Sequence, residues 1–159
     1  MTTTTPTTTE SRLRVLVYSD NRNRRAEVIS LLGPRPSAEL PRVEYVECAT
    51  EPMVIRALTP GARVRSEIEQ LPSLDSGGID LCILDGEAVP AGGMGIARQL
   101  KDEIYECPPI LLIVGRPADA WLATWSRADD VAPLPLDPLE FPESVAALLR
   151  GRIAALPAT

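Results

Sequence analysis

Asp85 is the residue in this sequence that is best placed to do chemistry. It directly follows an apolar run, residues 81–84, and precedes a glycine-rich stretch, residues 86–95. Such a run is typical of a buried parallel strand, and open α/β sheets place their functional residues at the carboxyl ends of these strands. Asp20 and Asn21 follow a second short strand pattern, and either could cap the next helix. The first question is therefore whether Asp85 reacts or only holds the loop after it.

The rest of the sequence offers few partners for catalysis. There is no histidine in the chain, which removes the commonest general base and the commonest metal ligand. The three cysteines lie far apart without a CxxC pair, so neither a disulfide framework nor a zinc site is expected. No pair of catalytic carboxylates and no cofactor motif is recognisable. We therefore predict that the protein is not an enzyme and that it carries no metal and no cofactor.

A glycine cluster precedes the helical pattern that follows Asp85. Gly92, Gly93 and Met94 could suggest a phosphate-binding loop, but the segment lacks the GK[ST] of a P-loop and the GxGxxG of a dinucleotide site. Glycines also allow another backbone to approach closely. We expect Gly92, Gly93 and Met94 to contact a protein partner instead.

Composition limits the classes of partner. The net charge is −6 and the 16 Lys and Arg residues are scattered, whereas nucleic-acid-binding proteins are usually basic. No apolar run approaches the length that is needed to span a membrane. Nucleic-acid binding and direct membrane insertion are not expected, and the expected compartment is the cytoplasm.

The chain alternates strand and helix patterns five times, which predicts an α/β fold with a doubly wound parallel sheet. The expected strands are residues 14–18, 43–49, 81–84, 110–114 and 131–132. The second of these alternates apolar and acidic residues and is expected near the edge of the sheet. Residues 1–11 are a Thr-rich tail, disordered or held by a partner, and residues 155–159 form a second tail. Residues 59–78 look like an insertion.

Three segments resemble the receiver domain of response regulators. They are RVLVYSDN, DLCILDGEAVP and ADDVAPLPLDPLEF, and the likeness covers residues 12–152. The resemblance implies one domain over residues 12–154. Its fold would be a flavodoxin-like (βα)5 receiver fold with the strand order 2-1-3-4-5.

The resemblance also assigns roles to single positions. Asp85 stands at the phosphoacceptor position, and the acidic pair that would bind Mg²⁺ falls on Ser19 and Asp20. The hydroxyl that responds to the phosphoryl group falls on Val114, and the lysine that pairs with it falls on Leu134. Phosphoryl transfer to a carboxylate needs a divalent ion and a cation to neutralise the phosphoryl oxygens. We therefore predict a degenerate receiver, or pseudo-receiver, that works without phosphorylation. The alternative is an atypical orphan response regulator that is still phosphorylated on Asp85.

Trp121 and Trp125 are the only tryptophans and lie four residues apart. They could pack one helix face against the core, since tryptophan is usually largely buried. They could also be interface anchors. The resemblance favours the second interpretation, because the fourth helix, fifth strand and fifth helix form the usual interaction face of receivers. Leu136 and Phe141 would then join this partner-binding surface.

A closer resemblance concerns the partner. The segments LDGEAVPAGGMGIARQLKDEIYECPPI and GRPADAWLATWSRAD are similar to actinobacterial orphan receiver-like proteins that are associated with respiratory NADH:quinone oxidoreductase, complex I. This resemblance implies an accessory or regulatory subunit bound to the peripheral arm of that complex. It would place the protein at the inner face of the cell membrane through its partner.

Overall fold

The computed structural model describes residues 12–58, 78–104 and 107–155 as a three-layer α/β domain. In chain order its elements are β1 (Leu13–Tyr18), α1 (Arg22–Leu32), β2 (Val43–Cys48), α2 (Glu51–Leu58), β3 (Leu81–Asp85), α4 (Gly93–Glu103), β4 (Ile110–Val114), the 3-10 helix η2 (Pro117–Trp121), α5 (Leu122–Ser126), β5 (Asp130–Pro133) and α6 (Glu140–Ala155). The Thr-rich tail at 1–11 and nearly all of the expected insertion at 59–78 lie outside the described residues.

The five strands form one parallel sheet in the order β2-β1-β3-β4-β5, which confirms the predicted topology. Every residue of β1, β3 and β4 is buried, as is expected for central strands that are covered on both faces. β2 and β5 form the two edges, and several of their residues are partly exposed. β2 therefore lies where its alternating sequence predicted.

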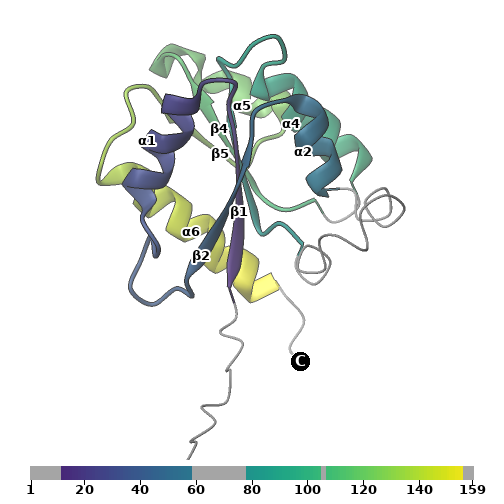
Figure 1. Cartoon of the computed structure of the whole chain (residues 1–159). Helices are drawn as coiled ribbons and strands as arrows, with labels where there is room; N and C mark the ends of the chain where they lie inside the picture. Colours follow the sequence, from purple (N-terminus) through teal and green to yellow (C-terminus); the bar gives the residue numbers. More distant parts are fainter. Residues whose placement is uncertain (1–11, 59–77, 105–106, 156–159) are drawn as a thin grey trace, which may run out of the picture.

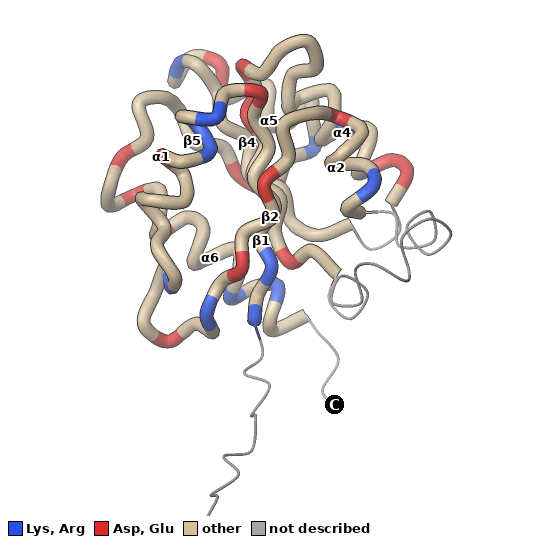
Figure 2. The backbone as a smooth tube through the Cα atoms, viewed as in Figure 1, with Lys and Arg blue, Asp and Glu red and all other residues tan. Residues whose placement is uncertain are grey.

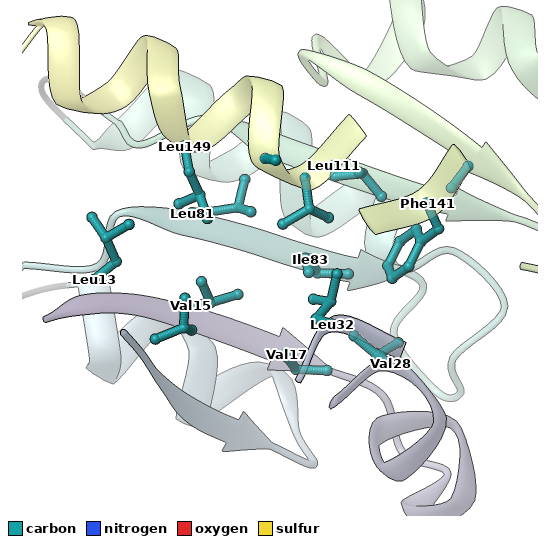
Figure 3. Packing of buried hydrophobic residues seen from close by; sticks show 14 of the residues in the cluster. Leu13, Val15, Val17, Val28, Leu32, Leu81, Ile83, Leu111, Phe141 and Leu149 are labelled. Carbon is teal, nitrogen blue, oxygen red and sulfur yellow. The ribbon is translucent and has the colours of Figure 1, made fainter. Parts of the chain in front are cut away.

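Helices cover both faces of the sheet (Figure 1), with α1 and α6 on one face and α2, α4 and α5 on the other. The first core cluster joins α1 and α6 to side chains of β1, β3 and β4. Figure 3 shows Val28 and Leu32 of α1 and Phe141 of α6 close to Ile83 of β3. The second cluster joins α2 and α4 to the opposite face of the same strands. Within the described ranges, no helix is long and apolar enough to cross a bilayer.

The segment after β4 differs from the sequence-based expectation. One helix was expected to open at Pro117 and to carry both tryptophans, but the structure has a 3-10 helix followed by the short α5. Arg127 ends α5 in the left-handed conformation, with φ 63°. The strand that follows, Asp130–Pro133, extends one residue beyond the expected strand at each end.

Gly93 fixes how closely α4 approaches β3. A Cβ atom on Gly93 would lie 2.9 Å from the carbonyl carbon and oxygen of Asp85 and 3.0 Å from the Cβ of Leu84. Because the nearest of these atoms belong to the backbone, the helix would have to move to admit a side chain. Gly95, two residues later in α4, has open space around the corresponding position.

We expect Gly93→Ala to lower the free energy of unfolding by about 1–3 kcal/mol, because the added methyl group overpacks the contact between the helix and the strand. Gly95→Ala is the matched control in the same helix. It should raise the stability by up to about 1 kcal/mol, because alanine favours the helix and meets no neighbour. Urea unfolding of both variants measures the difference. Equal effects of the two substitutions would contradict the close approach.

Candidate functional site

The candidate site lies at the carboxyl ends of β1 and β3. These strands are neighbours, with Tyr18 of β1 in register with Leu84 of β3. Ser19 and Asp85 are therefore side by side, and the Ser19 hydroxyl donates a hydrogen bond of 2.8 Å to Asp85 Oδ2. Both residues are buried, at 0% and 4% exposure. The sequence pattern identified both positions but not this contact.

Both oxygens of the Asp85 carboxylate accept a hydrogen bond from the chain itself. Its Oδ1 accepts a hydrogen bond of 2.9 Å from the backbone N–H of Glu87, and its Oδ2 is held by Ser19. Its carbonyl oxygen accepts from the Ala88 N–H at 3.2 Å. A buried carboxylate is stable only when it has such partners. Asp85 thus holds the turn that opens the β3–α4 loop.

Asp20 also contacts this loop. Its Oδ1 accepts a hydrogen bond of 3.2 Å from the N–H of Val89. Asn21 is the residue that caps α1, since its side chain accepts from the N–H groups of Asn23 and Arg24 at 2.8 and 3.3 Å. Of the two capping candidates, the structure therefore selects Asn21 and leaves Asp20 to fix the loop.

Tyr18 completes the connection between β1 and the loop. Its hydroxyl donates a hydrogen bond of 2.5 Å to the carbonyl oxygen of Ala91. Burial raises the pKa of Tyr18, and the nearby carboxylates of Asp20, Glu51 and Asp85 raise it further. The phenol therefore stays protonated and able to donate. Sequence analysis missed this residue, because its partner lies 73 positions away and no motif connects the two.

Val114 and Leu134 occupy the positions where the resemblance places a hydroxyl and a lysine. Val114 is buried at the end of β4, at 2% exposure. Leu134 is partly buried, packs against the first core cluster and donates its N–H to the Val114 carbonyl at 2.9 Å. The contact between these two positions is thus a backbone hydrogen bond. Neither side chain can bind a phosphoryl oxygen.

Glu87 is a second residue that sequence analysis missed. Its Oε1 accepts a hydrogen bond of 3.0 Å from the N–H of Gly115, the first residue after β4. A Cβ on Gly115 would lie 2.6 Å from the same oxygen, so glycine permits this approach. The loop after β3 is therefore tied to the end of β4 as well as to the end of β1.

The oxygen atoms that could serve as metal ligands at this site do not fit the Mg²⁺ ion that the family resemblance implies. Mg²⁺ is bound through carboxylates that keep free oxygen lone pairs directed at the ion. Here Ser19 replaces one carboxylate and donates a hydrogen bond to Asp85, and Asp20 Oδ1 accepts a hydrogen bond from the N–H of Val89. Within the described part of the chain, no group of three or more His, Cys, Asp or Glu side chains is placed to hold a metal ion.

The cysteines offer no reactive thiolate. Burial raises the pKa of Cys48 to about 11 and raises the pKa of Cys82 and of Cys107 above its usual range. The thiolate is the nucleophilic form, so all three side chains are protonated and unreactive near neutral pH.

The glycine cluster contacts its own chain. A Cβ on Gly92 would lie 3.0 Å from the carbonyl oxygen of Gly86, and Gly93 packs against Asp85. Met94 is partly buried against the second core cluster. The backbone that lies close to these glycines within the chain is that of β3 and the loop after it. Their contact with a protein partner stays a prediction.

The structure resolves the two interpretations of the tryptophans. Trp121 is 66% exposed and Trp125 is 48% exposed, so the core-packing interpretation is wrong. Leu136 and Phe141 were expected on the same partner-binding surface, but they are 9% and 2% exposed and belong to the first core cluster. The amphipathic α6 turns Phe141 toward the sheet, where it is not available to a partner.

Comparison with known proteins places these observations in context. No protein-family model matches the chain. Two proteins of Mycobacterium tuberculosis, each named an uncharacterized response regulatory protein, are 52% identical to it over 139 residues. One is from strain H37Rv and the other from strain CDC 1551, and the match covers 87% of this chain and 92% of each relative.

Solved structures share the fold at low sequence identity. A response regulator receiver domain protein from Clostridium thermocellum superposes with a TM-score of 0.66 at 17% identity, over 91% of this chain and 99% of that one. The BeF3-activated receiver domain of DrrB superposes with a TM-score of 0.60, also at 17% identity, over 88% and 99% of the two chains.

We expect Ser19→Ala to destabilise the protein by about 1–3 kcal/mol, because it leaves the buried Asp85 Oδ2 without its hydrogen bond. Ser30→Ala is the control, since Ser30 is exposed in α1 and its loss should change stability by no more than about 0.5 kcal/mol. Thermal or urea unfolding gives both values. Similar values for the two variants would show that the Ser19–Asp85 bond does not hold the site.

Proposed function

This chain belongs to the response-regulator receiver family, and we propose that it is a protein-interaction module that works without phosphorylation. The observation that carries the proposal is the Ser19–Asp85 hydrogen bond of 2.8 Å. In this arrangement the phosphoacceptor position is a buried structural group, and its carboxylate oxygens are bonded to the chain itself.

Charge explains why this site disfavours phosphoryl transfer. The transferred group carries negative charge on three oxygens, and the transition state is stabilised by metal ions and fixed cations. Ser19 and Leu134 each replace a charged residue at the positions that the family resemblance assigns. A neutral hydroxyl and an alkyl group leave that charge without compensation in a site of low dielectric. The same groups suit a structural role in holding the loop after β3. They are consistent with a binding module rather than an enzyme.

We expect no phosphoryl adduct on the wild-type chain after incubation with acetyl phosphate and Mg²⁺, as measured by intact-protein mass spectrometry. Combining Ser19→Asp, Val114→Thr and Leu134→Lys restores the groups that phosphoryl transfer needs. This triple variant should become labelled in a Mg²⁺-dependent reaction. Adding Asp85→Asn to it should abolish the labelling.

Labelling of the wild-type chain on Asp85 would contradict the proposal. It would support the second candidate function, an atypical orphan response regulator that uses Asp85 as its phosphoacceptor. That candidate has one observation in its favour, namely that Asp85 stands at the carboxyl end of the central strand β3. Urea unfolding of the triple variant checks that a negative result does not come from loss of the fold.

We further propose that the partner is respiratory NADH:quinone oxidoreductase and that the chain is an accessory or regulatory subunit on its peripheral arm. Two sequence segments support this proposal, since they resemble receiver-like proteins associated with that complex. One contains the β3–α4 loop and the other contains Trp121 and Trp125. Receiver domains act through protein contacts, and such a subunit would lie at the cytoplasmic face of the membrane through its partner alone.

We expect subunits of the oxidoreductase to co-purify with the affinity-tagged chain from detergent-solubilised membranes of the source cells. Asp85→Asn should co-purify equally well, because the amide oxygen can accept from the Glu87 N–H and the amide N–H can donate to the Ser19 hydroxyl, while the phosphoacceptor is removed. Quantitative mass spectrometry of the eluates measures both. Recovery of the chain alone from membranes and cytosol would contradict the accessory-subunit role.

A further inference from the structure

Trp121 and Trp125 form the centre of an exposed surface on η2 and α5. They are the only tryptophans in the chain, and they are 66% and 48% exposed. Single exposed apolar residues are common on protein surfaces, but tryptophan is highly buried on average. Two exposed tryptophans four residues apart therefore require a specific explanation. The neighbouring helix provides one.

Arg98 of α4 lies over the ring of Trp125, with its guanidinium carbon 4.8 Å from the ring centroid. Figure 1 shows α4 and α5 on the same face of the sheet, and the two helices contact each other. A cation over an aromatic face is held electrostatically, and stacking leaves the edge of the planar guanidinium open. Arg98 makes no hydrogen bond or ion pair with the residues that the structure describes.

The two other arginines on η2, α5 and their flanks, Arg116 and Arg127, are paired with carboxylates. Arg116 binds Asp119 within η2 at 3.3 Å, and Arg127 binds Asp102 of α4 at 2.7 Å. Acidic and basic segments are interspersed along the backbone in Figure 2, and the net charge of the chain is −6. The tryptophan surface therefore presents a positive charge, that of Arg98, which lies over the Trp125 ring and has no carboxylate partner among the described residues.

We infer that Arg98, Trp121 and Trp125 dock a segment of the protein partner that carries a carboxylate next to an apolar side chain. This inference rests on the proposed function and specifies the chemistry of the partner. The carboxylate accepts two parallel hydrogen bonds from the Arg98 guanidinium, a geometry that matches the two groups. The apolar side chain covers Trp121. Tryptophan and arginine are the residue types that most often dominate binding energy in protein interfaces.

Two other occupants suit the surface less well. An anionic membrane attracts clusters of several basic residues, whereas within the described residues this surface offers one arginine without an ion-pair partner, in a chain of net charge −6. A second copy that docked symmetrically through the same surface would offer Asp102 and Asp119 to Arg98, but both of these carboxylates are engaged in ion pairs. The experiments below distinguish a membrane and a second copy from the proposed partner segment.

The test measures binding of the purified chain to purified NADH:quinone oxidoreductase that has been stripped of it. We expect Trp121→Ala and Arg98→Glu each to weaken binding by about tenfold or more, as for anchor residues in other interfaces. Arg98→Lys should have a smaller effect, since lysine keeps the charge but loses the planar fork. Arg22→Glu is the matched control, because Arg22 is an exposed arginine of α1 on the opposite face of the sheet. It should change binding by no more than about twofold, as a change outside the interface.

A photo-cross-linking amino acid at position 121 identifies what lies on the surface. We expect a cross-link to a peptide of the oxidoreductase that contains Asp or Glu, and reversal of that carboxylate to Arg should restore binding of Arg98→Glu. A cross-link between two copies of this chain would overturn the inference. Binding of the chain to vesicles of anionic lipid, lost in Arg98→Glu, would overturn it as well.

The outcomes separate this inference from the proposed function on which it rests. If the wild-type chain binds the oxidoreductase and all four variants bind equally, the accessory role stands and the docking surface is wrong. If the wild-type chain does not bind at all, both proposals are wrong. Because the variants change exposed side chains, equal unfolding midpoints confirm that their effects on binding are direct.

Discussion

The hydrogen bond between Ser19 and Asp85 is the contact on which the functional end of this domain depends. It joins the carboxyl ends of β1 and β3 in the buried centre of the sheet. The residues on either side of Ser19 also hold this loop, because the Tyr18 hydroxyl donates a hydrogen bond to the Ala91 carbonyl and Asp20 accepts one from the Val89 N–H. Three consecutive residues of one strand end thus hold the β3–α4 loop. A cluster of unpaired carboxylates could not do this without a counter-ion.

The glycines of this loop stabilise the same contact between the loop and the strand ends. Gly92 and Gly93 let the start of α4 lie against Gly86 and Asp85 without a steric clash. Glu87 also connects the loop to the end of β4, because its carboxylate accepts a hydrogen bond from the N–H of Gly115. The loop is therefore held by hydrogen bonds at the ends of both neighbouring strands.

The sequence predicted the elements whose signal is local and strong, and it missed contacts that depend on tertiary geometry. Runs such as 110–114 are apolar on both faces, so their central position in the sheet follows from burial alone. The burial of the two tryptophans could not be predicted, because their spacing places them on one helix face but does not say whether that face points to the core or to solvent. The structure turns Ser126 inward, where its hydroxyl donates to the Ala123 carbonyl, and leaves Trp125 outside. The change from a 3-10 to an α-helix within this segment has no periodic signature.

The replaced residues also decide whether the domain can switch. A receiver that responds to phosphorylation needs side chains that adopt different positions when the phosphoryl group is present. Here the Gly86 N–H, just after β3, donates a hydrogen bond to the Ile113 carbonyl of β4. The Leu134 N–H, just after β5, donates one to the Val114 carbonyl of β4. These are backbone hydrogen bonds of a fixed sheet. A ligand shifts a population only through differential contacts with two states, and the Val114 and Leu134 side chains have no polar group to make such a contact with a phosphoryl group. If the chain works without phosphorylation, as proposed, binding at the tryptophan surface is set by the concentrations of the chain and its partner rather than by a signal at Asp85.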